Sequence, residues 1–153
     1  SLKAVLHTHT RDGAAVSAQR DGLLPISQHA LAYYSRVVYH DYEGVALDLD
    51  EQARLVANLG DSNILILRNH GLLTGGVSVE HAFRELHGLE RACNIQVAAQ
   101  AGGNDQLLHA SEAAIAKVHE QSKRFSDGQG EGIQRHWDAL IRQLDREGRD
   151  YQD

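Results

Sequence analysis

The sequence predicts an α/β domain in which helices pack on a central sheet, and three observations lead to this prediction. Residues 64–67 are apolar at four consecutive positions, as is typical of a strand covered on both faces. A second short apolar run, residues 4–6, lies near the start of the chain. Residues 78–146 carry apolar side chains at intervals of three and four, which is typical of helices with one buried face. Strands interspersed with helices imply a layered arrangement.

The first part of the chain predicts short elements separated by turns. In order, these are a strand at residues 4–6, a helix at 11–20, an extended piece at 23–25 and a strand at 37–39. Asp21-Gly22 is a turn dipeptide and ends the helix. The first strand runs directly into a His-Thr-His sequence, and the second leads into His40 and Asp41. Both strands therefore end in residues that can do chemistry.

The middle of the chain predicts a helix followed by the central strand. Asp50 is a suitable N-cap for a helix that ends before Gly60. The buried face of this helix is expected to carry Ala53, Val56 and Leu59. The strand at 64–67 is placed centrally because both of its faces are apolar. The apolar residues that follow it are expected to break at Gly75-Gly76.

The second half of the chain predicts three amphipathic helices. Ser78 is a suitable cap for the longest of them, which ends at Gly102-Gly103. Two shorter helices are expected at residues 111–126, with Ile115, Val118 and Phe125 inward, and at 132–146, with Trp137, Leu140, Ile141 and Leu144 inward. We interpret residues 104–153 as a helical tail of a single domain that spans residues 1–153.

Composition narrows the class of protein. A chain of 153 residues with 42% hydrophobic residues is the size of one folded domain, and it has no apolar stretch long enough to span a membrane. Cys93 is the only cysteine, so no intramolecular disulfide can form and a reducing, cytoplasmic compartment is expected. The net charge is −6 and the basic residues are scattered, which argues against binding to nucleic acid.

The most specific feature is the pair of histidines at positions 7 and 9. Side chains alternate along a strand, so residues i and i+2 point the same way, close enough for two imidazoles to share one metal ion. Ten histidines in the chain make a chance pair the competing interpretation. A catalytic zinc typically has three protein ligands and one open position. We choose His70 as the third ligand, because it follows the central strand at a glycine-assisted turn.

Three segments together resemble the class II aldolase/adducin family. They are AVLHTHTRDGAAVSAQRDGLLPIS, YHDYEG and ILILRNHGLLTGG, followed by a helix that contains LERACNIQV. The resemblance covers residues 3 to about 100, and the adducin-like branch is nearer than the sugar-phosphate aldolases. It implies a three-layer α/β/α domain with a largely antiparallel sheet, assembled as a homo-oligomer, commonly a tetramer.

The resemblance also implies a function and a ligand set. In the enzymes of the family, the histidines that correspond to His7, His9 and His70 bind zinc, although another divalent metal is possible. The expected activity is that of an aldehyde-lyase, which acts on a small hydroxy-carbonyl or sugar-phosphate substrate through a metal-stabilised enediolate. An epimerase or dehydratase could use the same metal site. The alternative is a non-catalytic adducin-like module of the actin/spectrin type that keeps the fold and the ligands.

Two departures from the family limit these expectations. The phosphate-binding loop and the acidic acid/base residue of the enzymes have no counterpart in this chain, so the chain is expected to be a fragment that lacks strands and activity. His40 and Asp41 are the remaining acid/base candidates, although both can equally shape a loop. We expect His81 and His87 to lie at solvated positions on the long helix.

Overall fold

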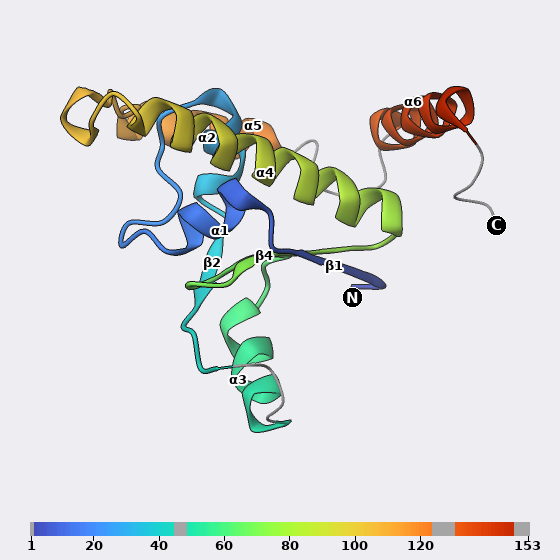
Figure 1. Ribbon diagram of the computed structural model, residues 1–153, viewed down its shortest axis with the longest axis horizontal. Helices are drawn as coiled ribbons and strands as arrows, with labels where there is room; N and C mark the ends of the chain where they lie inside the picture. Colours follow the sequence, from blue (N-terminus) through green and yellow to red (C-terminus); the bar gives the residue numbers. More distant parts are fainter. Residues whose placement is uncertain (1, 45–48, 124–130, 149–153) are drawn as a thin grey trace.

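The computed structural model describes residues 2–44, 49–123 and 131–148 of the chain (Figure 1). Within these ranges the elements are β1 (Ala4–Thr8), α1 (Arg11–Ser17), α2 (Gln28–Tyr34), β2 (Val38–His40), α3 (Leu49–Leu59), β3 (Ile64–Leu67), β4 (Gly71–Gly76), α4 (Val79–Gln100), the 3-10 turn η1 (Asn104–Gln106), α5 (Glu112–Lys123) and α6 (Glu131–Glu147). None of the described helices is long and apolar enough to cross a membrane.

The four described strands form one largely antiparallel sheet, as expected. Their order is β1-β4-β3-β2. The β1–β4 and β4–β3 pairs are antiparallel, and the β3–β2 pair is parallel. All four residues of β3 are buried, and β3 lies between β4 and β2. The prediction of a central strand at 64–67 is therefore confirmed.

Helices lie on both faces of the sheet, which gives the three layers. Figure 1 shows α1, α2, α4 and α5 on one side and α3 on the other. The long helix α4 contacts β1 and β4, and α3 contacts the end of β2. The helix α6 lies apart from the sheet and contacts α4 (Figure 1). The fold class predicted from the sequence is thus correct.

The core lies between the sheet and the α1–α4 layer. Ile66 and Leu72 of the sheet are fully buried against Val16 of α1 and Leu89 of α4. Removing each such side chain from water contributes roughly 1.5–3 kcal/mol to folding. These contacts fix α1 and α4 to the sheet, and both helices hold parts of the site described below.

The helix α4 begins as predicted, with Ser78 as its cap. The Ser78 hydroxyl accepts a hydrogen bond from the backbone N of His81 at 3.3 Å. His81 itself is only 4% exposed, so the expected solvated position is wrong for this histidine. Its ring lies on the side of α4 that also buries Glu85, to which its Nε2 is 3.6 Å away. The prediction was wrong because a search for an apolar stripe leaves out polar residues that pair with each other inside the protein.

Several local predictions are wrong. Helix α2 was not expected. In α3, Asp50 lies inside the helix rather than at its cap, and Val56 is 62% exposed. Of the expected face only Leu59 is partly buried, and the other partly buried residues of α3 include Glu51 and Leu55. Both stripes fit a helical period, and only the position of β2 selects between them.

The expected break at Gly75-Gly76 is also wrong, because both glycines belong to β4. A Cβ atom on Gly76 would lie 2.5 Å from the backbone N of Ala82, so glycine allows α4 to approach the strand closely. Phe125 lies outside the described residues. In the final helix, Trp137, Leu140 and Ile141 are partly buried, whereas Leu144 is 41% exposed.

Candidate metal centre

The strand pairing brings the three predicted histidines to one end of the sheet. His7 lies in β1 opposite Leu73 of β4, and His9 follows the end of β1. His70 lies in the turn that joins β3 to β4. Because β4 pairs with both β3 and β1, this turn passes beside the end of β1.

The ring nitrogens of the three histidines converge. His7 Nε2 is 2.7 Å from His9 Nε2 and 3.3 Å from His70 Nε2. One nitrogen from each ring lies within 4.8 Å of the others, and His7 and His9 are exposed. The structure thus brings together the three side chains that sequence reasoning selected, in a cluster that could hold a metal ion.

The tautomer of His7 is fixed by the strand beside it. Its Nδ1 is 2.8 Å from the backbone oxygen of Leu72. A carbonyl oxygen only accepts hydrogen bonds, so Nδ1 carries the hydrogen and donates it. The lone pair of His7 is therefore on Nε2, the atom that faces the other two rings. This is the arrangement that orients histidines in metal sites.

His70 is held through its backbone and kept neutral by its surroundings. Its N–H lies 3.1 Å from the hydroxyl of Ser17, a fully buried residue at the end of α1. Asn69, just before it, has a φ of 55° and donates its N–H to the Ser17 oxygen at 3.2 Å. Burial lowers the pKa of His70, and the neighbouring His7 and His9 lower it further. A neutral imidazole is the form that binds a metal.

The segment after His9 is anchored to the long helix. Thr10 donates a hydrogen bond from its hydroxyl to Glu90 of α4 at 2.5 Å. Asp12 accepts one from the amide of Asn94, also on α4. Gly13 leaves room for this approach, because a Cβ there would lie 2.8 Å from the Glu90 carboxylate. Neither Glu90 nor Asn94 was singled out from the sequence, since only the packing of α1 on α4 brings them to the site.

A cavity of about 200 Å³ adjoins the cluster on the α3 side of the sheet. His7 and His70 form part of its wall, and Leu55, Leu67 and Leu73 supply apolar surface. The remaining lining residues are polar: His40, Asp41, Tyr42, Glu51 and Arg68. The ring of Tyr42 lies 6.2 Å from that of His70. The cluster therefore opens onto a partly apolar space for a small molecule.

The sequence that forms this sheet and site matches a known family. Residues 1–97 match the profile of the Class II Aldolase and Adducin N-terminal domain. The chain belongs to this family. The match covers the segment that contains all three clustered histidines and the whole of the described sheet.

Relatives of this class II aldolase/adducin domain include bacterial and animal proteins. An aldolase II superfamily protein from Pseudomonas syringae is 66% identical in sequence over 99% of this chain and 60% of that one. Its crystal structure matches this chain with a TM-score of 0.94. Alpha-adducin of Rattus norvegicus is 44% identical over 95% of this chain and 21% of its own length. The L-fuculose 1-phosphate aldolase of Glaciozyma antarctica, 24% identical over 97% of this chain and 55% of that one, shares the fold with a TM-score of 0.75.

These relatives are longer than the chain. It spans 58% of a 47% identical relative from Pseudomonas aeruginosa, and 60% of the Pseudomonas syringae structure. The activities of the full-length family members are therefore assigned to this domain only as a proposal.

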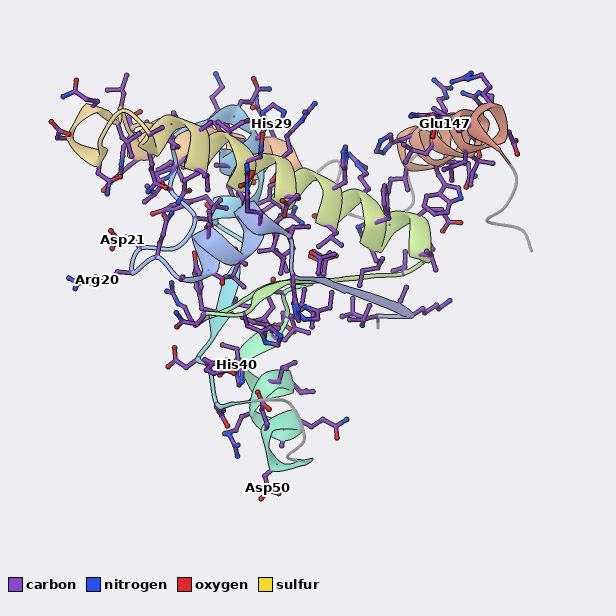
Figure 2. The ribbon with its side chains drawn as sticks, viewed as in Figure 1. Arg20, Asp21, His29, His40, Asp50 and Glu147 are labelled. Atoms are coloured by element: carbon purple, nitrogen blue, oxygen red, sulfur yellow. The ribbon has the colours of Figure 1, made fainter. Side chains whose placement is uncertain are left out.

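His40 and Asp41, the two acid/base candidates, line the cavity of this aldolase/adducin domain in different ways. His40 is 3% exposed and lies on the α3 side of the sheet (Figure 2). Its Nδ1 lies 2.8 Å from the Asn58 side-chain amide, and its Nε2 lies 3.4 Å from Glu51. Both ring nitrogens are thus engaged by α3. Asp41 is exposed at the rim.

Glu51 is one of the residues of this cavity that sequence reasoning missed. It lines the cavity beside His70, and its carboxylate raises the pKa of His70 against the larger effect of burial. Its side chain is 13% exposed. The spacing of Glu51, Leu55 and Leu59 is compatible with one buried side of α3, but Ala53, Val56 and Leu59 form a more apolar stripe, and neither pattern indicates a role at the site.

Proposed function

We propose that His7, His9 and His70 bind a catalytic-type zinc ion in the metal-binding portion of an aldolase-type lyase. The observation that supports this proposal most is the convergence of three Nε2 atoms on one point at the end of β1. Three imidazoles suit zinc, and other divalent metals remain alternatives. The substrate proposed is a small hydroxy-carbonyl compound or sugar phosphate.

The residues present fit such a metal. The hydrogen bond from His7 to Leu72 puts the lone pair of the ring on Nε2, and burial lowers the pKa of His70, which favours its neutral form. When bound, the metal supplies a positive charge that stabilises the enediolate left after a carbon–carbon bond next to a carbonyl breaks. Epimerisation and dehydration would use the same charge.

The rest of the cavity would place the substrate. Leu55, Leu67 and Leu73 give it an apolar wall that limits access of water. The Glu51 carboxylate, which is paired with the buried His40, gives the cavity a polar edge, and a direct catalytic role of His40 or Asp41 stays a prediction.

The second candidate function is a non-catalytic interaction module. The 44% identity with rat alpha-adducin supports the interaction module, because this relative is named as an adducin and not as an aldolase. Metal ligands can persist after catalysis is lost. For either function we propose a homo-oligomer, by analogy with the family. We also propose a cytoplasmic location, because a chain whose sole cysteine is Cys93 forms no intramolecular disulfide, as is usual in a reducing compartment.

Metal analysis of the purified chain tests the site. We expect about one equivalent of zinc after dialysis near neutral pH, and loss of it in His7→Ala and in His70→Ala. His29→Ala is the matched control, because His29 is exposed on α2 and lies on the opposite side of the sheet from His40 (Figure 2). If the unmodified chain binds no metal, or if His29→Ala loses it equally, the proposed site is wrong.

A second measurement separates the enzyme from the module. Because the chain is expected to be inactive by itself, binding is measured instead of turnover: the zinc-loaded chain should bind a hydroxamate that mimics the enediolate, and His70→Ala should not. Stoichiometric metal without any binding of the hydroxamate would favour the adducin-like module.

A further inference from the structure

Arg68 lies beside the histidine cluster with its guanidinium held in place. It follows β3 directly and precedes His70 by two residues. Its guanidinium carbon lies 4.0 Å from the centre of the Tyr39 ring. Its Nη1 donates a hydrogen bond to the backbone oxygen of Gln19 at 2.7 Å. The stacking on Tyr39 and this hydrogen bond fix the plane of the guanidinium. The hydrogen bond uses only one of the N–H donors of the guanidinium.

Arg68 differs from Arg36 and Arg54 in lacking an acidic partner, and it differs from the exposed Arg20 in being partly buried. Arg36 is paired with Glu85 at 2.8 Å, and Arg54 is paired with Glu43. Within the part of the chain that the structure describes, no carboxylate lies within ion-pair distance of Arg68, although the residue is partly buried. A partly buried guanidinium without a counter-ion is suited to bind an anion from solution.

Arg68 also links the metal-site cavity to a second one. This second cavity, of about 490 Å³, shares Asp41, Tyr42 and Arg68 with the first, so the two adjoin. Arg20 contributes to its wall from the turn after α1, where its side chain points outward (Figure 2). The charged residues of the second cavity are thus two guanidiniums and one carboxylate, a net charge of +1.

We propose that Arg68, assisted by Arg20, binds the anionic end of the substrate, a phosphate or a carboxylate. This inference rests on the proposed function, in which the hydroxy-carbonyl end of the same molecule lies at the three histidines. The planar fork of a guanidinium matches two oxygens of either anion. The substrate would then lie across Tyr42, with its reactive end in the smaller cavity and its charged end in the larger.

Amide and guanidinium NMR spectra of the full chain test the assignment with inorganic phosphate and acetate as probes. At low ionic strength, phosphate should cause saturable shifts at Arg68, Asn69 and Tyr42. Arg68→Gln should weaken binding by about tenfold, and Arg20→Gln by about threefold. Asp41→Asn should tighten binding about twofold, because it removes the opposing charge. Tighter binding of acetate than of phosphate would identify a carboxylate as the preferred end.

Two controls make the result decisive. Arg20 is exposed, so Arg20→Gln tests the cavity even if Arg68→Gln does not fold. His70→Ala removes a proposed metal ligand but should leave the phosphate shifts at Arg68 intact, so failure of the metal site and failure of the anion site can be told apart. Shifts that do not saturate, or that persist unchanged in Arg20→Gln and in a folded Arg68→Gln, overturn the inference.

Discussion

The hydroxyl of Ser17 accepts a hydrogen bond from the backbone N–H of His70 at 3.1 Å. Ser17 lies at the end of α1, and α1 begins two residues after His9. One short helix therefore connects the end of β1, which carries two of the histidines, to the turn that carries the third. The relative position of His9 and His70 depends on α1 rather than on the sheet alone.

Replacing Ser17 with alanine should loosen the site more than the fold. The His70 N–H would keep only its 3.1 Å bond to Leu67, and we expect about tenfold weaker zinc binding with a loss of about 1 kcal/mol in unfolding free energy. Competition with a chromophoric chelator measures the affinity, and urea unfolding measures the stability. Ser35→Ala, at an exposed serine that ends α2, is the control. Equal zinc affinity in both variants would contradict the role of Ser17.

The sequence was informative where one pattern has one structural solution. Four apolar residues at 64–67 can hardly form anything but a covered strand, and Ser78 before a long periodic run identifies the start of α4. It was misleading in α3, where Leu55 and Val56 lie on alternative stripes. Which stripe is buried depends on contacts with β2, and these are 15 or more residues away along the chain.

The same distinction applies to the candidate site. His7 and His9 could be paired by strand geometry, and His70 by its position after the central strand together with the family resemblance. Glu51 and Glu90 could not be found in this way, because each reaches the site from a helix whose rotation is set by packing. Residues that support a site from other elements carry no local signal of that role.

Gly71 should be intolerant of any side chain, for steric rather than conformational reasons. A Cβ atom there would collide with the backbone oxygen of Thr8 and lie 3.2 Å from the His9 ring. Gly71→Ala should therefore push β4 away from β1, cost about 1–3 kcal/mol, and reduce zinc binding.

Gly132 provides the contrasting variant in the same chain. A Cβ atom there meets nothing within 4 Å, and the residue lies in α6. Gly132→Ala should stabilise the protein by up to about 1 kcal/mol and leave zinc binding unchanged. Urea midpoints and zinc stoichiometry for the two variants check this pair. A Gly71→Ala protein with unchanged stability would show that the β1–β4 contact is looser than described.

Asp12 should contribute to the loss of stability in acid. Hydrogen bonds from Arg11 and Asn94 lower the pKa of its carboxyl below the ordinary value. Since the folded pKa is below the unfolded one, the stabilisation is complete above about pH 4 and is lost as the pH falls through the folded pKa.

Asp12→Asn should remove that part of the acid dependence and lower stability at neutral pH. Thermal unfolding at a series of pH values from 7 to 2 measures it, with the exposed Asp61→Asn as control. If the unmodified chain and Asp12→Asn lose stability in parallel below pH 4, the hydrogen bonds to Asp12 do not carry the effect.

Docking of α6 on α4 should weaken as the pH falls below neutrality. His87 of α4 stacks on Phe83 with an interplanar angle of 7° and lies 5.7 Å from His136 of α6. Burial lowers the pKa of His87, and His136 and Arg91 lower it further. The docked state therefore binds the proton less well than the undocked one. Its stabilisation is complete above the ordinary histidine pKa of about 6.5 and is lost as the pH falls through the docked value.

Trp137 reports this transition, because it is the only tryptophan and its ring lies 5.6 Å from Phe83. Its emission should shift to longer wavelength between pH 8 and pH 5 as the ring enters water. In His87→Phe, which keeps an aromatic ring on Phe83 but cannot be protonated, the shift should be smaller. An identical pH profile in the variant would assign the change to another group and exclude His87 as its cause.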